Sequence, residues 1–197
     1  MTSGATDRDR AKADRSDAIL RAAARLFAER GFSGVSLEEL GNAVGITGPA
    51  LYRHFAGKQA LLGAILVSVS ERLLAGGREV AASEIPADER LRELIRFHVD
   101  FAVTDADVIR VHDRDLASLT DTDRHTVRRL QREYIDVWTD TLGAIHPDRA
   151  HDELRLRAHA AFGLINSTPH SVRGIAAPND ATVRRTLESM AYAALVC

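Results

Sequence analysis

The chain has 197 residues, 45% of them hydrophobic and 27% charged, with a formal net charge of −2. This length allows a sizeable core in one or two domains and excludes a small fold that depends on disulfides or metal. The single cysteine, Cys197, excludes an intrachain disulfide and a cysteine-rich metal site, and it fits a reducing compartment. The slightly acidic balance excludes a generally basic coat for nucleic acid, so any contact with nucleic acid would have to come from a local surface.

No segment of the sequence has the pattern of a targeting or membrane-spanning segment. The longest apolar run, residues 60–67, is far shorter than the about 18 residues that a spanning helix needs, and the N-terminus lacks the apolar core of a secretory signal. We therefore expect a cytoplasmic protein with no membrane partner.

Residues 1–15 alternate acidic and basic side chains and contain no large apolar residue after Met1, which predicts a disordered N-terminal arm. Binding of this arm in a DNA minor groove through Arg8, Arg10 or Lys12 is an alternative, which the interleaved acidic residues disfavour.

A first helix is expected from Ser16, which can cap its start, to Arg30, and Gly31 supplies the stop. Its apolar residues recur at helical spacing on one face. This helix is expected to brace the segment that follows it.

Residues 36–58 have the outline of a helix-turn-helix. Ser36 and Glu39 have the spacing of a capping box, in which each side chain binds the backbone N–H of the other residue. A short helix is therefore expected to start near Leu37, and Gly45 can take the left-handed conformation that ends it.

Thr47 can cap a second helix, which tolerates Pro49 in its first turn and buries Leu51 and Phe55. Two short helices joined by a tight turn are the outline of a DNA-binding motif whose second helix lies in the major groove. Residues 45–61 contain no acidic side chain, as a surface that faces phosphates requires. An ordinary helical corner has the same spacing, and spacing alone leaves this alternative open.

A specific motif resembles the N-terminal domain of tetracycline-repressor (TetR) family regulators. It consists of Ala50-Leu51-Tyr52-Arg53-His54-Phe55, then Lys58 and Ala60-Leu61-Leu62, preceded by Gly31-Phe32 and Val35-Ser36. The resemblance covers residues 16–62. It implies that Tyr52, His54 and Lys58 contact DNA, largely through its backbone.

The resemblance also places base-reading residues at the start of the second helix, where Gly48 and Ala50 have no polar side chain. Arg53 and Thr47 are therefore the best candidates for reading bases, and Arg53 could make a bidentate contact to guanine. The full predicted DNA-binding set is Ser36, Thr47, Gly48, Pro49, Ala50, Tyr52, Arg53, His54 and Lys58.

The rest of the chain is helical in pattern, and no strand pattern occurs in the sequence. A fourth helix starts near Lys58 and is expected to be interrupted at Gly76-Gly77. The sequence thus predicts an all-α protein, with a three-helix helix-turn-helix domain over residues 16–60 and a larger helical-bundle domain over residues 61–197. The resemblance assigns effector binding and dimerisation to the second domain.

The helix expected over residues 150–172 is apolar nearly all round, so it must bury one side in its own core and the other against a partner. The resemblance agrees, because TetR-type proteins dimerise through a four-helix bundle of their last two long helices. A homodimer would place two recognition helices ~34–36 Å apart and bind a palindromic operator in double-stranded DNA. Burial of the second side by the chain itself is the alternative. The predicted interface is Leu154, Ala158, Ala161, Ile165, Val183, Leu187, Met190 and Ala194.

The apolar stripes of the C-terminal helices contain polar and aromatic side chains that a pure core would not choose. They could line a small-molecule site, since such a site is mostly apolar with a few convergent polar groups. In the alternative, each is a core or rim residue whose polar atoms bind one neighbour or a water. The candidate effector pocket is His98, His112, Tyr134, Trp138, Phe162 and Asn166.

Together with the resemblance, these patterns predict a sequence-specific transcriptional regulator, a repressor that a small-molecule effector releases from its operator. A regulator without an effector, or an activator, is the first alternative. A helical enzyme or carrier is the second, but no nucleophile with a base, phosphate-binding glycine loop or metal-ligand motif has recognisable spacing. We therefore expect no catalytic activity, no cofactor and no metal.

Overall fold

The structure is a computed structural model that describes residues 7–46, 51–171 and 180–197, and within these ranges every regular element is helical. The all-α class predicted from the sequence is therefore confirmed. In chain order the helices are α1 (Asp7–Arg30), α2 (Leu37–Ala43), α4 (Lys58–Ala81), α5 (Ala87–Thr104), α6 (Ala106–Asp115), the short 3-10 helix η1 (Leu116–Ser118), α7 (Asp121–Ile145), α8 (His151–Asn166), α9 (Thr168–Ser171) and α10 (Asp180–Val196).

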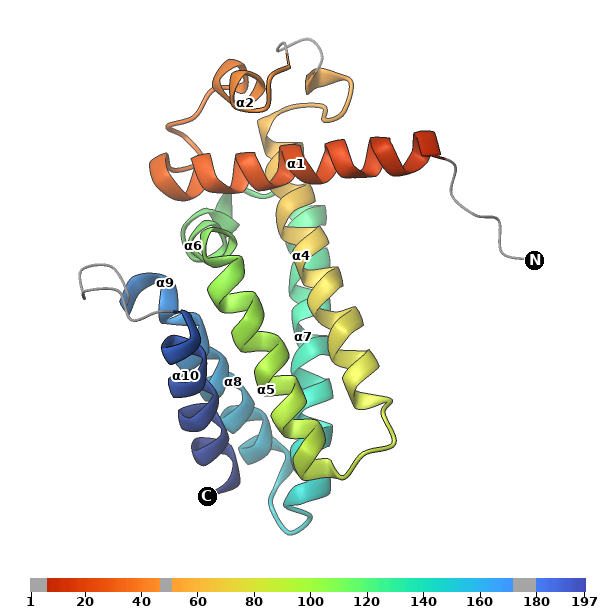
Figure 1. The fold of residues 1–197 in the computed structure, drawn as a ribbon, viewed down its shortest axis with the longest axis vertical. Coiled ribbons are helices and arrows are strands. Elements are labelled where there is room, and N and C mark those ends of the chain that lie inside the picture. Colours follow the sequence, from red (N-terminus) through yellow and green to blue (C-terminus); the bar gives the residue numbers. More distant parts are fainter. Residues whose placement is uncertain (1–6, 47–50, 172–179) are drawn as a thin grey trace.

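Figure 1 shows α1 lying across one end of the molecule, with α2 beyond it and α4 crossing it. α4 runs down the molecule beside α7, and α5, α8 and α10 complete a bundle towards the other end. Buried residues form two hydrophobic cores. One joins α1, α2 and α6 to the first half of α4, and the other joins α5, α7, α8 and α10 to its second half. α4 therefore connects the helix-turn-helix unit to the bundle.

α1 begins at Asp7, which corrects the expectation that residues 7–15 belong to a disordered arm and that Ser16 caps the helix. No Gly or Pro occurs from Asp7 to Arg30, and the Ala, Arg and Lys residues of this segment have high helix propensity. Alternating charges are thus compatible with helix as well as with disorder. Gly31 ends α1 with a φ of 80°, and its N–H donates to the Phe27 carbonyl at 2.8 Å, as expected for a C-terminal glycine.

The predicted capping box at the start of α2 is confirmed. The Ser36 hydroxyl accepts from the Glu39 N–H at 3.2 Å, and the Glu39 carboxylate accepts from the Ser36 N–H at 2.8 Å. The Arg30 guanidinium also donates to this carboxylate, at 2.6 Å. The hydrogen bonds from Ser36, and then that from Arg30, lower the pKa of Glu39 to about 2.

The glycine pair in α4 does not interrupt the helix, which continues to Ala81. A Cβ on Gly77 would lie 2.4 Å from Cε2 of Tyr134, and one on Gly76 would lie 2.3 Å from Cζ of Phe97. The two glycines therefore allow α5 and α7 to pack close against α4.

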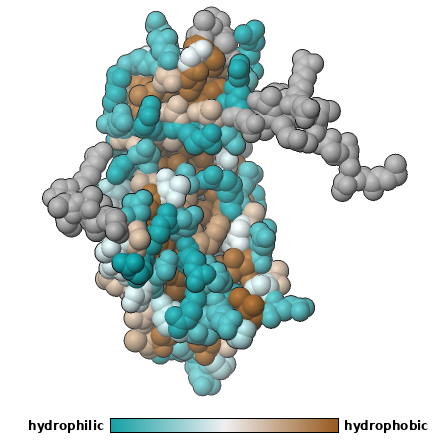
Figure 2. Space-filling model, in the orientation of Figure 1, coloured by the Kyte–Doolittle hydropathy of each residue, from teal (hydrophilic) through white to brown (hydrophobic). Residues whose placement is uncertain are grey.

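By length and composition alone, α4 is apolar enough to cross a membrane. In the fold, however, its residues Leu61, Leu62 and Leu66 are completely buried, and it packs along α7. Hydrophilic residues cover much of the molecular face seen in Figure 2, with hydrophobic residues scattered among them. The apolar character of α4 is therefore accounted for by its place in both cores.

Candidate DNA-binding surface and core cavity

The exposed surface of the helix-turn-helix carries several predicted DNA-binding residues. Leu51 is completely buried and holds the segment onto the core, whereas the adjacent Tyr52 is 57% exposed and Arg53 and His54 are also exposed. Ser36 is exposed at the start of α2. The other predicted contacts at Thr47, Gly48, Pro49 and Ala50 lie outside the described residues, so contact with DNA remains a prediction for the whole set.

Lys58 has a structural role in addition to its predicted contact with DNA. Its ammonium group donates to the Val35 carbonyl at 2.9 Å and lies 4.5 Å from the centre of the Phe32 ring. The start of α4 is thereby joined to the segment that precedes α2.

A cavity of about 270 Å³, here called the core cavity, lies between α4, α5, α6, α7 and α8. All but one of the predicted pocket residues line it, namely His98, His112, Tyr134, Phe162 and Asn166. Sequence reasoning missed the apolar lining, because an apolar residue on a core-facing stripe gives the same signal whether it meets a cavity or another side chain. The apolar lining residues are Val69, Leu73, Phe101, Val108, Ile109 and Ile135.

Trp138 does not line the core cavity, which corrects its assignment to the pocket. Its ring is completely buried, with its centre 4.8 Å from that of Phe162 and 6.0 Å from that of His98. Trp138 therefore lies behind the aromatic side chains that face the cavity.

His98 is the centre of a buried hydrogen-bonded chain at the cavity wall. Its Nε2 lies 3.2 Å from Oδ1 of Asn166, and its Nδ1 lies 3.5 Å from the Tyr134 hydroxyl. Burial lowers the pKa of His98 to about 3 and raises that of Tyr134, so both side chains are uncharged near pH 7. In this arrangement Nε2–H donates to Asn166 and Nδ1 accepts from Tyr134.

A second polar cluster lies on the α6 side of the core cavity. The side-chain amide of Gln131 lies 2.8 Å from Nε2 of His112, whose Nδ1 lies 3.4 Å from the Asp113 carboxylate. Asp113 is also 3.2 Å from Nε2 of His170. Within the described ranges, no group of three or more His, Cys, Asp or Glu side chains is arranged to hold a metal ion.

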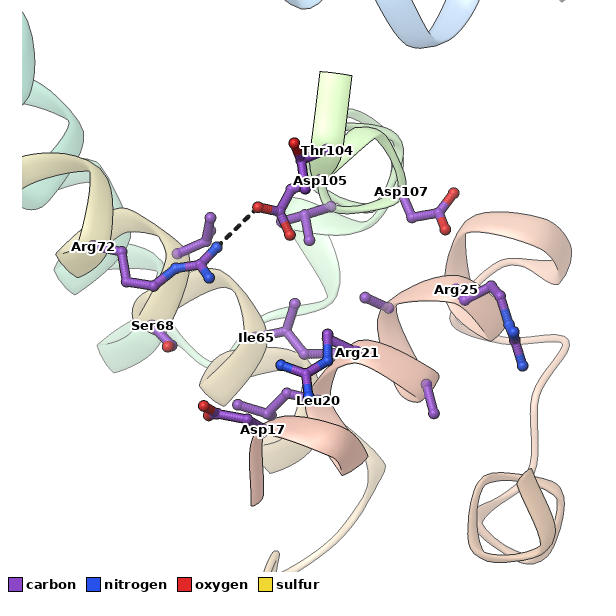
Figure 3. Close-up of a pocket in the computed structure, with 14 residues that line it drawn as sticks. Asp17, Leu20, Arg21, Arg25, Ile65, Ser68, Arg72, Thr104, Asp105 and Asp107 are labelled. Carbon is purple, nitrogen blue, oxygen red and sulfur yellow. Dashed lines mark hydrogen bonds and ion pairs between the residues drawn. The ribbon is translucent and has the colours of Figure 1, made fainter. Parts of the chain in front are cut away.

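A hollow of about 410 Å³, here called the α1 groove, lies between α1, α4 and the turn from α5 to α6 (Figure 3). Arg21 and Arg25 of α1 are among its lining residues, and an ion pair of 3.1 Å joins Arg72 of α4 to Asp105 of the turn. Val69 and Val108, which line the core cavity, also line this groove. The two hollows are thus separated by a wall that includes these two residues.

α6 is also joined directly to the end of α1. The Arg114 guanidinium donates to the carbonyls of Phe27 and Ala28, the second at 3.4 Å, and pairs with the buried Asp115 carboxylate at 3.0 Å. A shift of α6 would therefore act on the helix that braces the helix-turn-helix.

The predicted dimer interface divides into two groups. Leu154, Ala158, Ala161 and Ile165 are at most 3% exposed within the single chain. These four belong to the chain's own core, which corrects their assignment to a contact between chains. The predicted residues on α10 are more accessible: Met190 and Ala194 are exposed, and Val183 and Leu187 are half-buried.

The other side of α8 is exposed and partly apolar. Leu156 is 69% exposed, and Ala160 and Gly163, at helical spacing from it, are also exposed. Together with Met190 and Ala194 of α10, these residues form what we call the α8–α10 face.

Sequence models of one family match most of the chain. Residues 19–65 match the family described as "Bacterial regulatory proteins, tetR family", and residues 84–170 match the "Tetracyclin repressor-like, C-terminal domain".

Individual relatives agree with this match. The HTH-type transcriptional regulator Mb3439c of Mycobacterium bovis is 31% identical over 166 residues, which are 83% of this chain and 77% of the relative. The HTH-type transcriptional repressor KstR2 of Rhodococcus jostii is 27% identical over 145 residues, 73% of this chain and 71% of the relative. The fold is shared with AibR, solved in complex with isovaleryl coenzyme A and operator DNA, with a TM-score of 0.73 and 22% identity over 89% of this chain and 97% of AibR. The chain therefore belongs to the TetR family of bacterial transcriptional regulators.

Proposed function

We propose that the chain acts in the cytoplasm as a homodimeric repressor, which a small molecule in the core cavity releases from a palindromic operator. The observation that carries this proposal is the position of the cavity. It is bounded by α4, which begins in the helix-turn-helix unit, and by α6, which is joined to α1 through Arg114. A ligand there is in contact with the elements that orient the DNA-binding surface.

The family relatives support both halves of this proposal. KstR2 is named as a repressor, and AibR was solved with an acyl thioester of coenzyme A and with operator DNA. For this chain, the partners are double-stranded operator DNA and an effector that remains to be identified.

The α8–α10 face supports the homodimer. Leu156 and Met190 are among the large hydrophobic side chains that the described chain leaves exposed, and contact with a second copy would bury them. Small residues such as Ala160, Gly163 and Ala194 would let the helices of two chains approach closely. A two-fold axis through this face would pair the two recognition surfaces on a palindrome.

The wall between the two hollows provides the route for release. A ligand that displaces Val69 or Val108 would change the spacing of α4 and α6 at the α1 groove. Through Arg114, which binds the carbonyls of Phe27 and Ala28, this change would reach α1. A difference of about 1–3 kcal/mol in ligand affinity between the two conformations would give measurable control of DNA binding.

The dimer is tested by sedimentation of the chain with and without a cognate duplex. We expect the wild type to be a dimer that binds the duplex, and Leu156→Glu with Met190→Glu to give a folded monomer with much weaker binding. Glu71→Lys, at an exposed site of α4, is the matched control and should behave as wild type. A double variant that remains dimeric would contradict the proposed interface.

A further inference from the structure

We infer that the core cavity takes an uncharged, compact and mostly apolar molecule whose polar group accepts a hydrogen bond, such as a ketone. The inference rests on the proposed function, because it names the chemical class of the effector. It excludes carboxylates, phosphate esters and amines as good ligands for the cavity.

The volume and the lining of the core cavity determine the size and the apolar character of the ligand that fits it. Its volume of about 270 Å³ lies just below the range of about 300–1,000 Å³ that is usual for drug-sized ligands. Aliphatic residues of α4, α6 and α7 line it together with the rings of Phe101 and Phe162. Such walls stabilise a compact hydrocarbon skeleton by removing it from water.

The cavity offers no cation to an acidic ligand. Among its described lining residues there is neither Lys nor Arg. Two arginines of the neighbouring α6 are held elsewhere: Arg110 binds Asp107 at 2.7 Å and the Pro169 carbonyl at 3.0 Å, and Arg114 binds the end of α1. A carboxylate or phosphate would therefore lose its hydration without gaining an ion pair.

The ring nitrogens of two cavity histidines, His98 and His112, are already engaged by neighbouring side chains. His98 is kept neutral by its burial, and its Nε2–H is already bound to Asn166. At His112, Nε2 accepts from the Gln131 amide and Nδ1 faces Asp113. His159 is exposed at the edge of the lining.

Asp113 is the acidic residue among the described lining residues, and its negative charge would repel an anionic ligand. Its side chain is half exposed and already faces His112 and His170. An amine that enters the cavity would lose its hydration. In return it would gain only a weak ion pair, because the Asp113 carboxylate is solvated and already has other partners. This environment favours an uncharged ligand over either charged form.

Asn166 determines whether the preferred ligand donates or accepts a hydrogen bond. Its Oδ1 accepts from His98. Among the residues that the structure describes, its amide N–H groups make no hydrogen bond, so they are donors at the cavity wall. A carbonyl oxygen of the ligand can accept from them. A pure hydrocarbon would leave the donors without a partner and should bind less tightly.

Four probes with one carbon skeleton test this inference: 1-tetralone, tetralin, 1-aminotetralin and tetralin-1-carboxylate at pH 7.5. Trp138, the chain's one tryptophan, packs on Phe162 at the cavity wall and reports binding by its fluorescence, with calorimetry as a second readout. We expect 1-tetralone to bind tightest, tetralin about fivefold weaker, and both charged probes about tenfold weaker or more. Tighter binding of either charged probe, equal binding of ketone and hydrocarbon, or binding of none overturns the inference.

Two matched amide variants identify the donor. Asn166→Leu should abolish the preference for 1-tetralone over tetralin, whereas Gln131→Leu, at the other amide of the lining, should retain it. Preservation of the preference in Asn166→Leu overturns the role of Asn166. If Asn166→Leu does not fold, the wild-type complex gives the answer: the carbonyl stretch of bound 1-tetralone should lie below its value in hexane, and an unshifted band overturns the hydrogen bond.

The same preparation is tested for operator binding without probes. Failure to bind any duplex, with the order of probe affinities as expected, contradicts the proposed function and leaves the ligand class supported. Binding of a palindrome, with a charged probe preferred, contradicts the ligand class alone.

Discussion

Val69 of α4 and Val108 of α6 line both the core cavity and the α1 groove. Each is 8% exposed, and both belong to the hydrophobic core that includes α1. Their side chains thus form part of the wall between the proposed effector and the helix that packs beside the DNA-binding surface. Changes at this wall should affect communication between the two sites more than either site alone.

Val108→Ala tests this wall. Loss of two buried methyl groups should cost about 1–2 kcal/mol of unfolding free energy. The affinity of the variant for a cognate duplex in the absence of ligand should change little, but 1-tetralone should release the duplex less effectively than from the wild type. Fluorescence anisotropy of a labelled duplex, with and without the probe, measures this coupling.

Val99→Ala is the control for the effect of stability. Val99 is completely buried in the bundle core and lines neither hollow. It should lose similar stability and retain full release. An equal loss of release in both variants would show that the wall has no special role.

Gly77→Ala should destabilise the protein because the added Cβ would lie 2.4 Å from the Tyr134 ring. Overpacking of this kind costs about 1–3 kcal/mol. At Gly143 of α7 the nearest atom, Cδ1 of Leu154, would lie 3.8 Å from the new Cβ. Gly143→Ala should therefore be neutral or stabilising by up to about 1 kcal/mol. Urea unfolding of both variants measures the difference, and equal stabilities would contradict the close packing of α4 against α7.

Glu39 makes the stability of the helix-turn-helix depend on pH in the acidic range. Its pKa is lowered from 4.5 to about 2 in the folded chain, so its contribution is complete above pH 4.5 and is lost as the pH falls towards 2. Glu39→Gln should lower stability at pH 7, and the difference from wild type should shrink as the pH falls through this window. Glu38→Gln, on the exposed neighbour, should show no such change; circular dichroism during unfolding at each pH is the measurement.

His98 makes a pH-dependent contribution in a higher range. Burial lowers its pKa from 6.5 to about 3, so the unfolded chain takes up a proton below pH 6.5 that the folded chain does not. The contribution of His98 to the free energy of unfolding is fully present above pH 6.5. It falls as the pH drops towards 3, with a slope of at most about 1.4 kcal/mol per pH unit. His98→Gln should flatten this dependence between pH 5 and 7, whereas the exposed His151→Gln should keep it. A wild-type stability that does not change over this range would contradict a neutral, buried His98.

Local signals in the sequence were sufficient for much of the fold. Ser36 and Glu39 predict their capping box because the interaction involves residues in one helical turn. Gly31 predicts the end of α1 for the same reason. The sequence predicts His98 and Asn166 as pocket residues because polar side chains on apolar stripes require hydrogen-bond partners, and both line the core cavity.

Features that depend on neighbouring helices were harder to predict. From the sequence alone, Gly76 and Gly77 predict a break in the helix. The structure shows instead that glycine is needed at these positions because Phe97 and Tyr134 pack closely against them. A helix that is apolar on two sides does not indicate which side faces its own core. The stripe with the best helical spacing, which includes Leu154 and Ala158, proved to be the inner one.

Selection of bound DNA from a pool of random duplexes, at a stated salt concentration, tests the central claim most directly. A dimeric reader should recover a palindrome whose half-sites are centred one helical turn apart, ~34–36 Å. Arg53→Ala, at an exposed position of the DNA-binding surface, should then lose about 1–3 kcal/mol on that sequence and little on a scrambled duplex. Recovery of no common sequence by a folded, dimeric protein would contradict the account of this chain as a sequence-specific regulator.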